Sequence, residues 1–526
     1  MYPTRDNKEN LISRADPERT TRISGDGLVK DGPSPRGAYP AKIGPMRRRL
    51  VLMVILQIAL LAGLWAVVRD RRVPLGVRGE WEWPRLVAAG PNLHDLGLAV
   101  VVVAGYAGFT AAGMRSLGRR AGPIREAGWL AGLVGGAVVV QYAALVGAPE
   151  GYGPEKVPIV LWERGSSGYY TVAARQARDP LAFWAAYPGW VRRQDVLHIG
   201  THPPGLILAT AAALRTMRAR PGLAKAIAGN LPPRVEQGFR ELGNRFGPIP
   251  QADRAALALI GGLTLLACAA TVAPLYYLAR SSLPPPAAWA SAALWPLAAS
   301  ALLFLPAADV AFPFLAAAAL ACAARGRAIA AGGMLAIGMG FTLAFLPVGL
   351  AVALVLATAP GASTRRRLAR IAATGAGFLA LTLAGWAVSG ADPFVIWRWN
   401  LANHARFYAT YPRSHAAWAL VAPLDLAAGL GLPAACWVVA GFASRKAPRG
   451  AWGALAVLVL LDLSGRNRGE VARLWLPFMP LLLPAAGAGF ARLGAGPGSL
   501  AATVGLLGVQ VLMLQAMIQV VYVLGA

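Results

Sequence analysis

The chain has 526 residues, of which 56% are hydrophobic and only 14% are charged. An ordinary soluble protein has roughly 25% charged residues, so this chain has too little polar surface to cover its apolar residues in water. The net charge is +27, but most arginines stand at the ends of apolar segments, where they set topology and meet lipid headgroups. Composition therefore excludes a soluble protein and argues against a nucleic-acid partner. The three cysteines lie inside apolar segments, and their spacing predicts neither a disulfide framework nor a metal site.

The first residues differ from the rest of the chain. Residues 1–45 are polar, mixed in charge and rich in Gly and Pro, which predicts a disordered tail. Arg47, Arg48 and Arg49 directly precede the first apolar segment, so the positive-inside rule places the N-terminus in the cytoplasm. No signal peptide is expected, because the first apolar run begins near residue 50 and many more follow it.

Apolar segments near the roughly 20 residues that cross a bilayer recur to the C-terminus. They predict about thirteen spans, at 49–68, 95–114, 126–148, 254–279, 286–304, 307–324, 327–342, 344–358, 367–388, 417–441, 451–464, 472–492 and 499–524. The two spans from 327 to 358 could instead form one long helix broken near Pro347. We therefore expect an all-α polytopic membrane protein with two N-terminal spans in 46–125, a central part in 126–358 and C-terminal transmembrane helices in 359–526.

Residues 204–217 are apolar but short for a span, and the basic loops decide their position. Short basic loops such as 325–327 and 445–449 all fall on the cytoplasmic side only if one crossing lies between residues 149 and 280. The segment 254–279 is the better span, so 204–217 is expected in or near the outer interface. All five histidines then lie in or beside four outer loops, which places any chemistry outside the membrane: 69–94, 149–253, 389–416 and 465–471.

The largest outer loop has the richest polar stretch. It contains Tyr169 and Tyr170, and later Asp195, His198 and His202 before a Pro-Pro pair. Proline disfavours the helical region for the residue before it, so His202 is expected on an extended segment just before a helix. The spacing could present a metal or phosphate site. The alternative is a helix-start turn with a solvated histidine.

A Tyr-rich helix followed by His-Pro-Pro at the start of a short apolar helix resembles the GT-C membrane glycosyltransferases. The branch with the protein O-mannosyltransferases and the lipid A aminoarabinose transferase is the most similar. The order that follows also matches: a span ending in Tyr276 to Arg280, a second span, the outer residue Asp309 and another span. The resemblance covers about residues 126–358 and implies a GT-C-like bundle with outer loops and juxtamembrane helices.

The resemblance implies an enzyme of the plasma (inner) membrane that takes a sugar from a polyprenyl-phosphate carrier. The acceptor, a protein, a lipid or a glycan, receives the sugar on the extracytoplasmic side. Such chemistry requires a carboxylate as general base and cationic groups or a divalent metal ion to stabilise the departing phosphate. The resemblance matches Asp309 to a metal- or phosphate-site acid, and His202 is the second candidate metal ligand.

The chain departs from the family at the expected base. Family members usually carry an acid a few positions before the tyrosine, where this chain has Ser166 and Ser167. Glu163 and Asp195 are therefore the leading candidates for the base, followed by Glu80.

Two of these acids also have structural interpretations. Glu163 could form a local ion pair with Arg164 or Lys156. Asp309 stands in a very short turn between two spans, where an ionisable group is costly and a functional role is expected. It could instead cap the helix that follows.

Two further outer loops mix aromatic, cationic and histidine side chains. His404, Arg406 and Tyr408 could bind a phosphosugar, with His404 and Arg406 as the favoured pair, or belong to an interfacial aromatic belt. Glu470 and Arg473 at i, i+3 could pair along a helix face or serve as a topological stop signal. With them, the candidate substrate-binding residues are Tyr169, Tyr170, His198, His202, His404, Arg406, Tyr408, Glu470 and Arg473.

Two other functions stay open. Asp425 and Asp462 lie within predicted spans and could form a proton path, which favours a transporter or flippase of a lipid-linked or anionic solute. Transporters usually show internal repeats, and none is clear here. A non-catalytic protein of the GT-C fold is the third hypothesis, because the expected acid before Tyr169 is missing.

Overall fold

The computed structural model describes residues 43–86, 90–119, 122–163, 165–194 and 196–518. The chain divides into the segment Met1–Gly44 and the unit Pro45–Ala526, and the following description concerns the second. Most of the predicted tail, residues 1–42, lies outside the described residues. The finer division of the chain into N-terminal, central and C-terminal parts stays a prediction.

Seven helical segments among the described residues are long and apolar enough to cross a membrane, which confirms an all-α membrane protein. An eighth is present if the bent pair of α20 (His415–Leu430) and α21 (Leu432–Ala443), which meet at 110°, counts as one span. The seven are α1 (Ile43–Arg69), α2 (Leu93–Gly118), α3 (Pro123–Val146), α11 with α12 (Gln251–Ala270, Val272–Arg280), α13 with η1 and α14 (Pro285–Leu294, Trp295–Leu297, Ala299–Phe304), α18 (Thr364–Ser389) and α25 (Pro497–Met517).

The other predicted spans coincide with short or interrupted helices. The 12 residues of α16 extend about 18 Å, less than the roughly 30 Å of a bilayer core, so the number thirteen stays a prediction. The break between α16 and α17 lies before Phe345, and Pro347 stands in the first turn of α17, where proline is tolerated. The break therefore lies a few residues before Pro347, near the predicted position. These helices are η2 (Ala308–Ala311), α15 (Phe312–Ala324), α16 (Ala328–Met339), α17 (Phe345–Ala357), α22 (Arg449–Ser464), α23 (Val471–Leu474), η3 (Leu476–Phe478) and α24 (Met479–Arg492).

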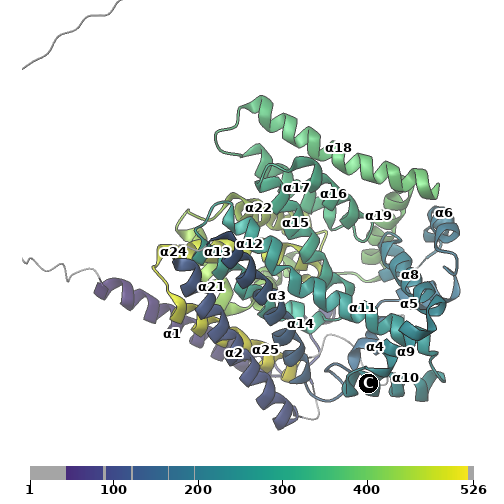
Figure 1. Ribbon diagram of the computed structural model, residues 1–526, viewed down its shortest axis with the longest axis horizontal. Helices are drawn as coiled ribbons and strands as arrows, with labels where there is room; N and C mark the ends of the chain where they lie inside the picture. Colours follow the sequence, from purple (N-terminus) through teal and green to yellow (C-terminus); the bar gives the residue numbers. More distant parts are fainter. Residues whose placement is uncertain (1–42, 87–89, 120–121, 164, 195, 519–526) are drawn as a thin grey trace, which may run out of the picture. The chain divides into compact units, whose positions relative to one another are not determined.

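The large loop 149–253 folds into short helices beside the start of α11 (Figure 1). Their apolar residues form a core with α11 and α19 (Pro393–Thr410) that is separate from the larger core of the bundle. In α10, for example, Val235, Phe239 and Leu242 recur at helical spacing and are buried. The helices of this loop are α4 (Lys156–Trp162), α5 (Tyr169–Arg175), α6 (Pro180–Val191), α7 (His198–Thr201), α8 (Gly205–Ala219), α9 (Pro221–Gly229) and α10 (Pro233–Phe246).

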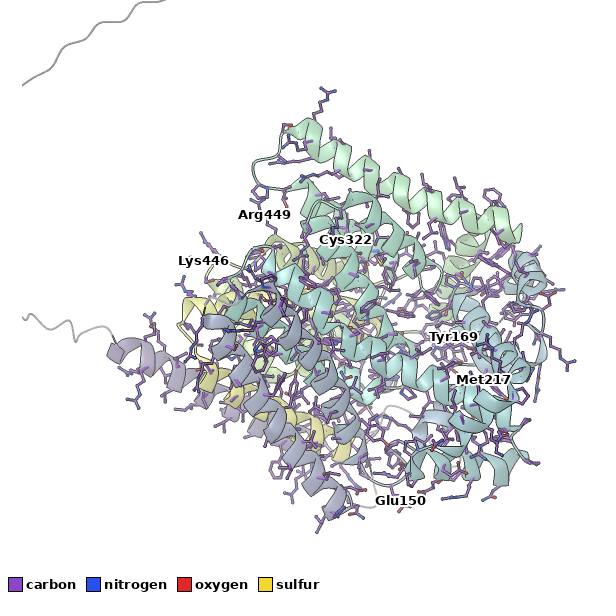
Figure 2. The ribbon with its side chains drawn as sticks, in the orientation of Figure 1. Glu150, Tyr169, Met217, Cys322, Lys446 and Arg449 are labelled. Carbon is purple, nitrogen blue, oxygen red and sulfur yellow. The ribbon has the colours of Figure 1, made fainter. Side chains whose placement is uncertain are left out.

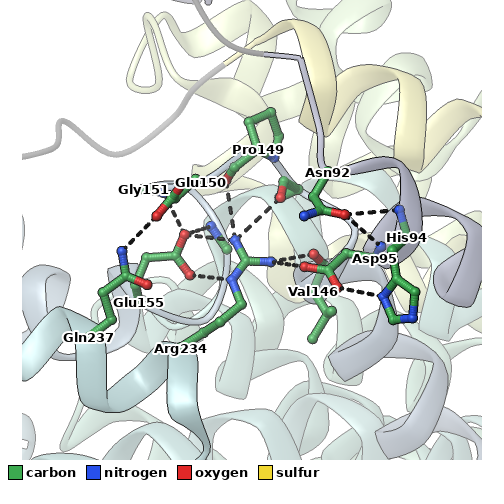
Figure 3. A network of polar contacts seen from close by, with 12 residues as sticks. Asn92, His94, Asp95, Val146, Pro149, Glu150, Gly151, Glu155, Arg234 and Gln237 are labelled. Atoms are coloured by element: carbon green, nitrogen blue, oxygen red, sulfur yellow. Dashed lines mark hydrogen bonds and ion pairs between the residues drawn. The ribbon is translucent and has the colours of Figure 1, made fainter.

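A buried ionic network joins this loop to helix α2 (Figure 3). Arg234 of α10 pairs with Glu155 at 2.7 Å and with Asp95 of α2 at 3.3 Å. The Glu155 side chain is fully buried, with 0% of its surface exposed. Because a buried charge is costly without a partner, the network fixes how the loop sits against the bundle.

The first outer loop contributes a small hairpin. Strands β1 (Gly76–Val77) and β2 (Trp81–Glu82) pair in antiparallel register. Between them, Glu80 accepts hydrogen bonds from the Ser414 amide and from Nε1 of Trp418, both at 2.8 Å. The hairpin therefore holds the start of α20.

Candidate functional site

Most of the predicted substrate-binding residues lie around one cavity of about 220 Å³. It lies between the one-turn helix α7, the second half of α19 and the segment 465–474. These segments are distant in the sequence. The lining residues are Gly165, Val196, Leu197, His198, Thr201, His202, His404, Phe407, Tyr408, Arg413, Arg468, Gly469, Glu470, Arg473 and Leu474.

His202 is held in place through its own backbone and its ring. Its φ of −112° and ψ of 145° are extended, as the following proline predicts, and α8 begins at Gly205. Nδ1 lies 2.9 Å from the His198 carbonyl oxygen. A carbonyl oxygen can only accept, so Nδ1 carries the hydrogen and Nε2 of the neutral ring is left as an acceptor.

Two asparagines of α19 hold the turn that carries this histidine. Asn400 Nδ2 donates to the carbonyl oxygens of Gly200 at 2.9 Å and His202 at 3.0 Å, and Asn403 Nδ2 donates to Gly200 at 2.7 Å. The hydroxyl of Tyr187 donates to the same His202 carbonyl at 2.6 Å. Both asparagines are buried, so these bonds position α7 rather than face solvent.

The three histidines of the cavity favour the neutral form. Burial lowers the pKa of His198 well below its usual value, and the positive charge of Arg473 lowers it further. Burial also lowers the pKa of His202, although the Asp309 carboxylate acts in the opposite direction. The pKa of His404 is lowered by burial and by His202. At neutral pH the imidazoles are therefore hydrogen-bonding groups, and the positive charge of the cavity comes from arginine.

Asp309 lies close enough to the cavity to act on its members. After burial, its carboxylate is the main cause that raises the pKa of Tyr169 well above the ordinary value, while Arg473 opposes that rise. The rings of Tyr169 and His202 meet edge to face, with centroids 6.2 Å apart. Asp309, Tyr169, His202 and Arg473 therefore form one electrostatically connected group.

Among the described residues that line the cavity, three carry guanidinium groups and one is acidic. Arg473 pairs with Glu470 at 2.7 Å. Arg413 and Arg468 each donate to the carbonyl oxygen of the other at 2.6 Å. Nε of Arg413 and Nε of Arg473 are buried and have no hydrogen-bond partner among the described residues. Buried donors without partners are costly, and an anion bound between these arginines would satisfy them.

The backbone of the segment 465–474 is strained at Glu470. Glu470 has a φ of +51°, which is rare for a residue other than glycine and costs about 1–3 kcal/mol. Tyr408 holds the segment from α19, because its hydroxyl donates to the Arg466 carbonyl at 2.8 Å and accepts from the Arg468 amide at 2.9 Å. The strained turn therefore presents Glu470 and Arg473 to the cavity.

An apolar cavity of about 290 Å³ adjoins this group. Tyr169 lines it, as do Ala308 and Ala311 on either side of Asp309. Phe312, Leu315 and Phe341 are among its other walls. Tyr169 therefore lines the apolar cavity while its ring meets that of His202, which lines the polar cavity.

Of the predicted acids before the motif, Glu163 does not line the cavity. The Glu163 carboxylate accepts from the Gly165 amide at 3.2 Å, so it turns back on its own loop beside the cavity. Its proposed partner Lys156 instead donates to the Leu303 carbonyl oxygen at 3.2 Å, so that ion pair is wrong, and Arg164 lies outside the described residues. Asp195 also lies outside them.

The position of the expected family acid is filled by a structural serine. Ser167 is buried, and its hydroxyl lies 3.1 Å from the carbonyl oxygens of both Val160 and Leu161. The next residue, Gly168, has a φ of +72°, a conformation that glycine adopts without strain, and Tyr169 then begins α5. A carboxylate at Ser167 would face two carbonyl oxygens, so a base must come from elsewhere.

Tyr170, Arg406 and Glu80 are engaged away from the cavity. The hydroxyl of Tyr170 donates to Asp253 at 2.6 Å, and its ring lines the apolar cavity. Arg406 is exposed and donates to Asn403. Residues two apart on a helix do not share a face, so His404 and Arg406 do not form the expected pair. Glu80 holds the start of α20, as described above.

Arg413 and Arg468 are the residues that the sequence analysis missed. Neither lies in a recognisable motif. Each donates to the carbonyl oxygen of the other from a distant part of the chain, and no local pattern in the sequence indicates such a bond. Their signal in the sequence is only the density of arginine in the outer loops. Asp309, in turn, is not a helix cap, because α15 is preceded by Ala311 and has no side-chain cap.

The described residues contain no preformed cluster of metal ligands. No group of three or more His, Cys, Asp or Glu side chains among them lies together in a way that could hold one. Asp309 and His202 supply two donors. A zinc site usually takes three or four protein ligands, whereas Mg²⁺ is usually held by one or two carboxylates together with substrate phosphates. The expected divalent metal ion stays a prediction.

No family model, curated protein or solved structure matches this chain. The resemblance to the GT-C glycosyltransferases therefore rests on the motifs of the sequence.

Proposed function

We propose that this chain is a membrane glycosyltransferase of the GT-C type that moves a sugar from a polyprenyl-phosphate donor to an acceptor. The observation that carries the proposal is the ring contact between Tyr169, which lines an apolar cavity, and His202, which lines an arginine-rich polar cavity. A lipid-linked phosphosugar has the same two parts. In this proposal the protein resides in the plasma (inner) membrane, with the N-terminus cytoplasmic and the cavity extracytoplasmic, and its bundle has about thirteen spans.

The reaction assigns a role to each group. An acceptor hydroxyl attacks the anomeric carbon of the sugar, the bond from that carbon to the phosphate oxygen breaks, and the electron pair leaves with the polyprenyl phosphate. A carboxylate takes the proton of the acceptor. Arg413, Arg468 and Arg473 stabilise the negative charge that develops on the leaving phosphate.

Among the described carboxylates, Asp309 is the favoured candidate for the general base. Asp309 is not among the described lining residues of the polar cavity. Its neighbours Ala308 and Ala311 line the apolar cavity with Tyr169, and its charge acts on His202, whereas Glu470 is already paired with Arg473. Glu163 and Asp195 stay candidates because their neighbours Gly165 and Val196 line the cavity.

The transporter hypothesis has less support. Asp425 accepts hydrogen bonds from Trp83 Nε1 at 2.9 Å and from the Ala472 amide at 3.2 Å, so it is a structural acceptor. The carbonyl oxygen of Asp462 lies 3.1 Å from Nε2 of His415. His415 begins α20 and precedes Asp425 by ten residues, or about 15 Å along the helix. The two acids therefore do not adjoin one another along a path.

The test is transfer of labelled sugar from polyprenyl-phosphate donors in membranes that contain wild-type or variant protein at matched expression. We expect Asp309→Asn and Arg473→Gln each to lower the transfer rate about 10²–10³-fold, as loss of one electrostatic group does in other enzymes. Arg398→Gln is the matched control, because Arg398 is exposed on α19 and does not line the cavity.

The outcomes separate the hypotheses. If transfer survives in both Asp309→Asn and Arg473→Gln, the proposed site is refuted. Glu163→Gln and Asp195→Asn would then be assayed to find the base. Absence of transfer with every donor, from a folded protein, would favour the transporter and the non-catalytic protein.

A further inference from the structure

A second polar cavity, of about 490 Å³, lies at the other end of the bundle. It is formed where α12 and α17 end and where α18 and α22 begin. The same α18 and α22 end next to the segments that carry His404 and Glu470, and the 26 residues of α18 extend about 39 Å. Figure 2 shows Lys446 and Arg449 far from Tyr169. This cavity is therefore distinct from the candidate site.

The mouth of the cavity is cationic and bears hydroxyl groups. Its charged lining residues are Arg370, Lys446 and Arg449, and none of the lining residues is acidic. Arg449 donates to the Thr358 carbonyl oxygen, but no hydrogen bond or ion pair joins the side chains of Arg370 and Lys446 to any described residue. Ser281 and Ser282 add two hydroxyl groups. Such a set of donors is typical of a site for a phosphate group.

The inner wall of the cavity is apolar. Leu278, Val355, Leu356 and Pro484 line it and are buried. A free inorganic phosphate would use the cationic mouth and leave this wall uncovered. A phospholipid would use both, because its phosphate joins a polar headgroup to an apolar glycerol and acyl region.

The surrounding loops carry the same charge. Residues 280–284, 325–327, 358–367 and 444–449 contain basic residues and no aspartate or glutamate. The positive-inside rule assigns this end to the cytoplasm, where anionic lipids are enriched and basic pockets between transmembrane helices bind their headgroups.

We propose that this cavity binds the phosphate group of an anionic phospholipid from the cytoplasmic leaflet. Arg370 and Lys446 contact the phosphate, and the apolar wall receives the glycerol end of the lipid. The proposal does not depend on the transferase activity, and its test needs no donor or acceptor.

The test is lipid binding to the purified full chain in detergent, measured by native mass spectrometry. Phosphatidylglycerol and cardiolipin are titrated against phosphatidylcholine, with inorganic phosphate and glycerol 3-phosphate as soluble competitors. The variant is Arg370→Gln with Lys446→Gln. Each cation near lipid phosphate is worth roughly a fivefold preference, so we expect anionic lipid to bind the double variant about thirtyfold more weakly.

Two controls keep the test decisive. Arg365→Gln with Arg366→Gln removes two exposed cations from the same helix outside the cavity, and we expect wild-type binding. Arg370→Lys with Lys446→Arg keeps the charge and should also bind, which separates lost charge from misfolding. Equal loss in both glutamine pairs, or equal binding of phosphatidylcholine, would overturn the proposal. Soluble phosphates that displace the lipid at similar concentrations would overturn the assignment to a lipid.

Discussion

The Arg234 network offers the sharpest test of how the large loop is held. Its guanidinium contacts Glu155 through two nitrogens, Nε to Oε2 at 2.9 Å and Nη2 to Oε1 at 2.7 Å, and it also contacts Asp95 at 3.3 Å. Arg234→Met would keep much of the volume but leave the fully buried Glu155 without its cation. Removing one partner of a buried ion pair costs about 3–5 kcal/mol, so we expect a loss of stability of that size.

The assay is thermal unfolding of the purified protein in detergent, followed by tryptophan fluorescence at one fixed scan rate because unfolding is often irreversible. Arg240→Met is the matched control, since Arg240 lies exposed on the same helix, and its effect should stay within about 0.5 kcal/mol. Adding Glu155→Gln to Arg234→Met should recover part of the loss, as a coupled pair requires. If Arg234→Met unfolds like the control, the network does not hold the loop.

Three further predictions concern the candidate site and its surroundings. The pKa values of His198, His202 and His404 are lowered in the folded protein, so the unfolded chain binds more protons than the folded one below about pH 6.5. The unfolding temperature should therefore fall as the pH drops from 7 to 5, and it should fall less steeply in His198→Gln. Gly469→Ala should lower sugar transfer at least tenfold, because a Cβ at this φ of +85° would collide with the guanidinium of Arg413; unchanged transfer would show that this turn does not position Arg413. Tyr170→Phe should cost about 1.5–3 kcal/mol through the lost bond to buried Asp253, and thermal unfolding that matches wild type would contradict this.

The membrane segments could be predicted where one apolar run forms one straight helix. Hydropathy counts apolar residues but does not detect breaks, so 417–441 was expected to be one span. Gly431, with a φ of +99°, instead ends α20, and α21 leaves at 110°. A side chain at this position would collide with Leu507, so the bend depends on a neighbour that the local sequence does not reveal.

The site could be predicted only where local rules act. The two prolines placed His202 on an extended segment before a helix. The helix α19, which carries His404 and Tyr408, was expected to be a loop. Arg413 and Arg468 could not be predicted in the same way, since their positions depend on reciprocal bonds between distant segments. Arg406 is exposed and does not line the cavity, which could not be foreseen because the density of charge in a loop does not give helix phase.

The charge of the cavity bears on how the proposed transfer would be accelerated. Among the described residues, its lining holds three guanidinium groups and one carboxylate, a balance of two positive charges. The proposed donor is a phosphodiester with about one negative charge, whereas the departing phosphate monoester approaches a charge of about −2. A fixed cluster of two positive charges therefore interacts more strongly with the leaving group than with the bound donor, and only such a difference raises the rate of the chemical step. The arginines can supply this stabilisation themselves. The carboxylate of Glu470, which pairs with Arg473, matters because it lowers the net charge of the described lining from three to two.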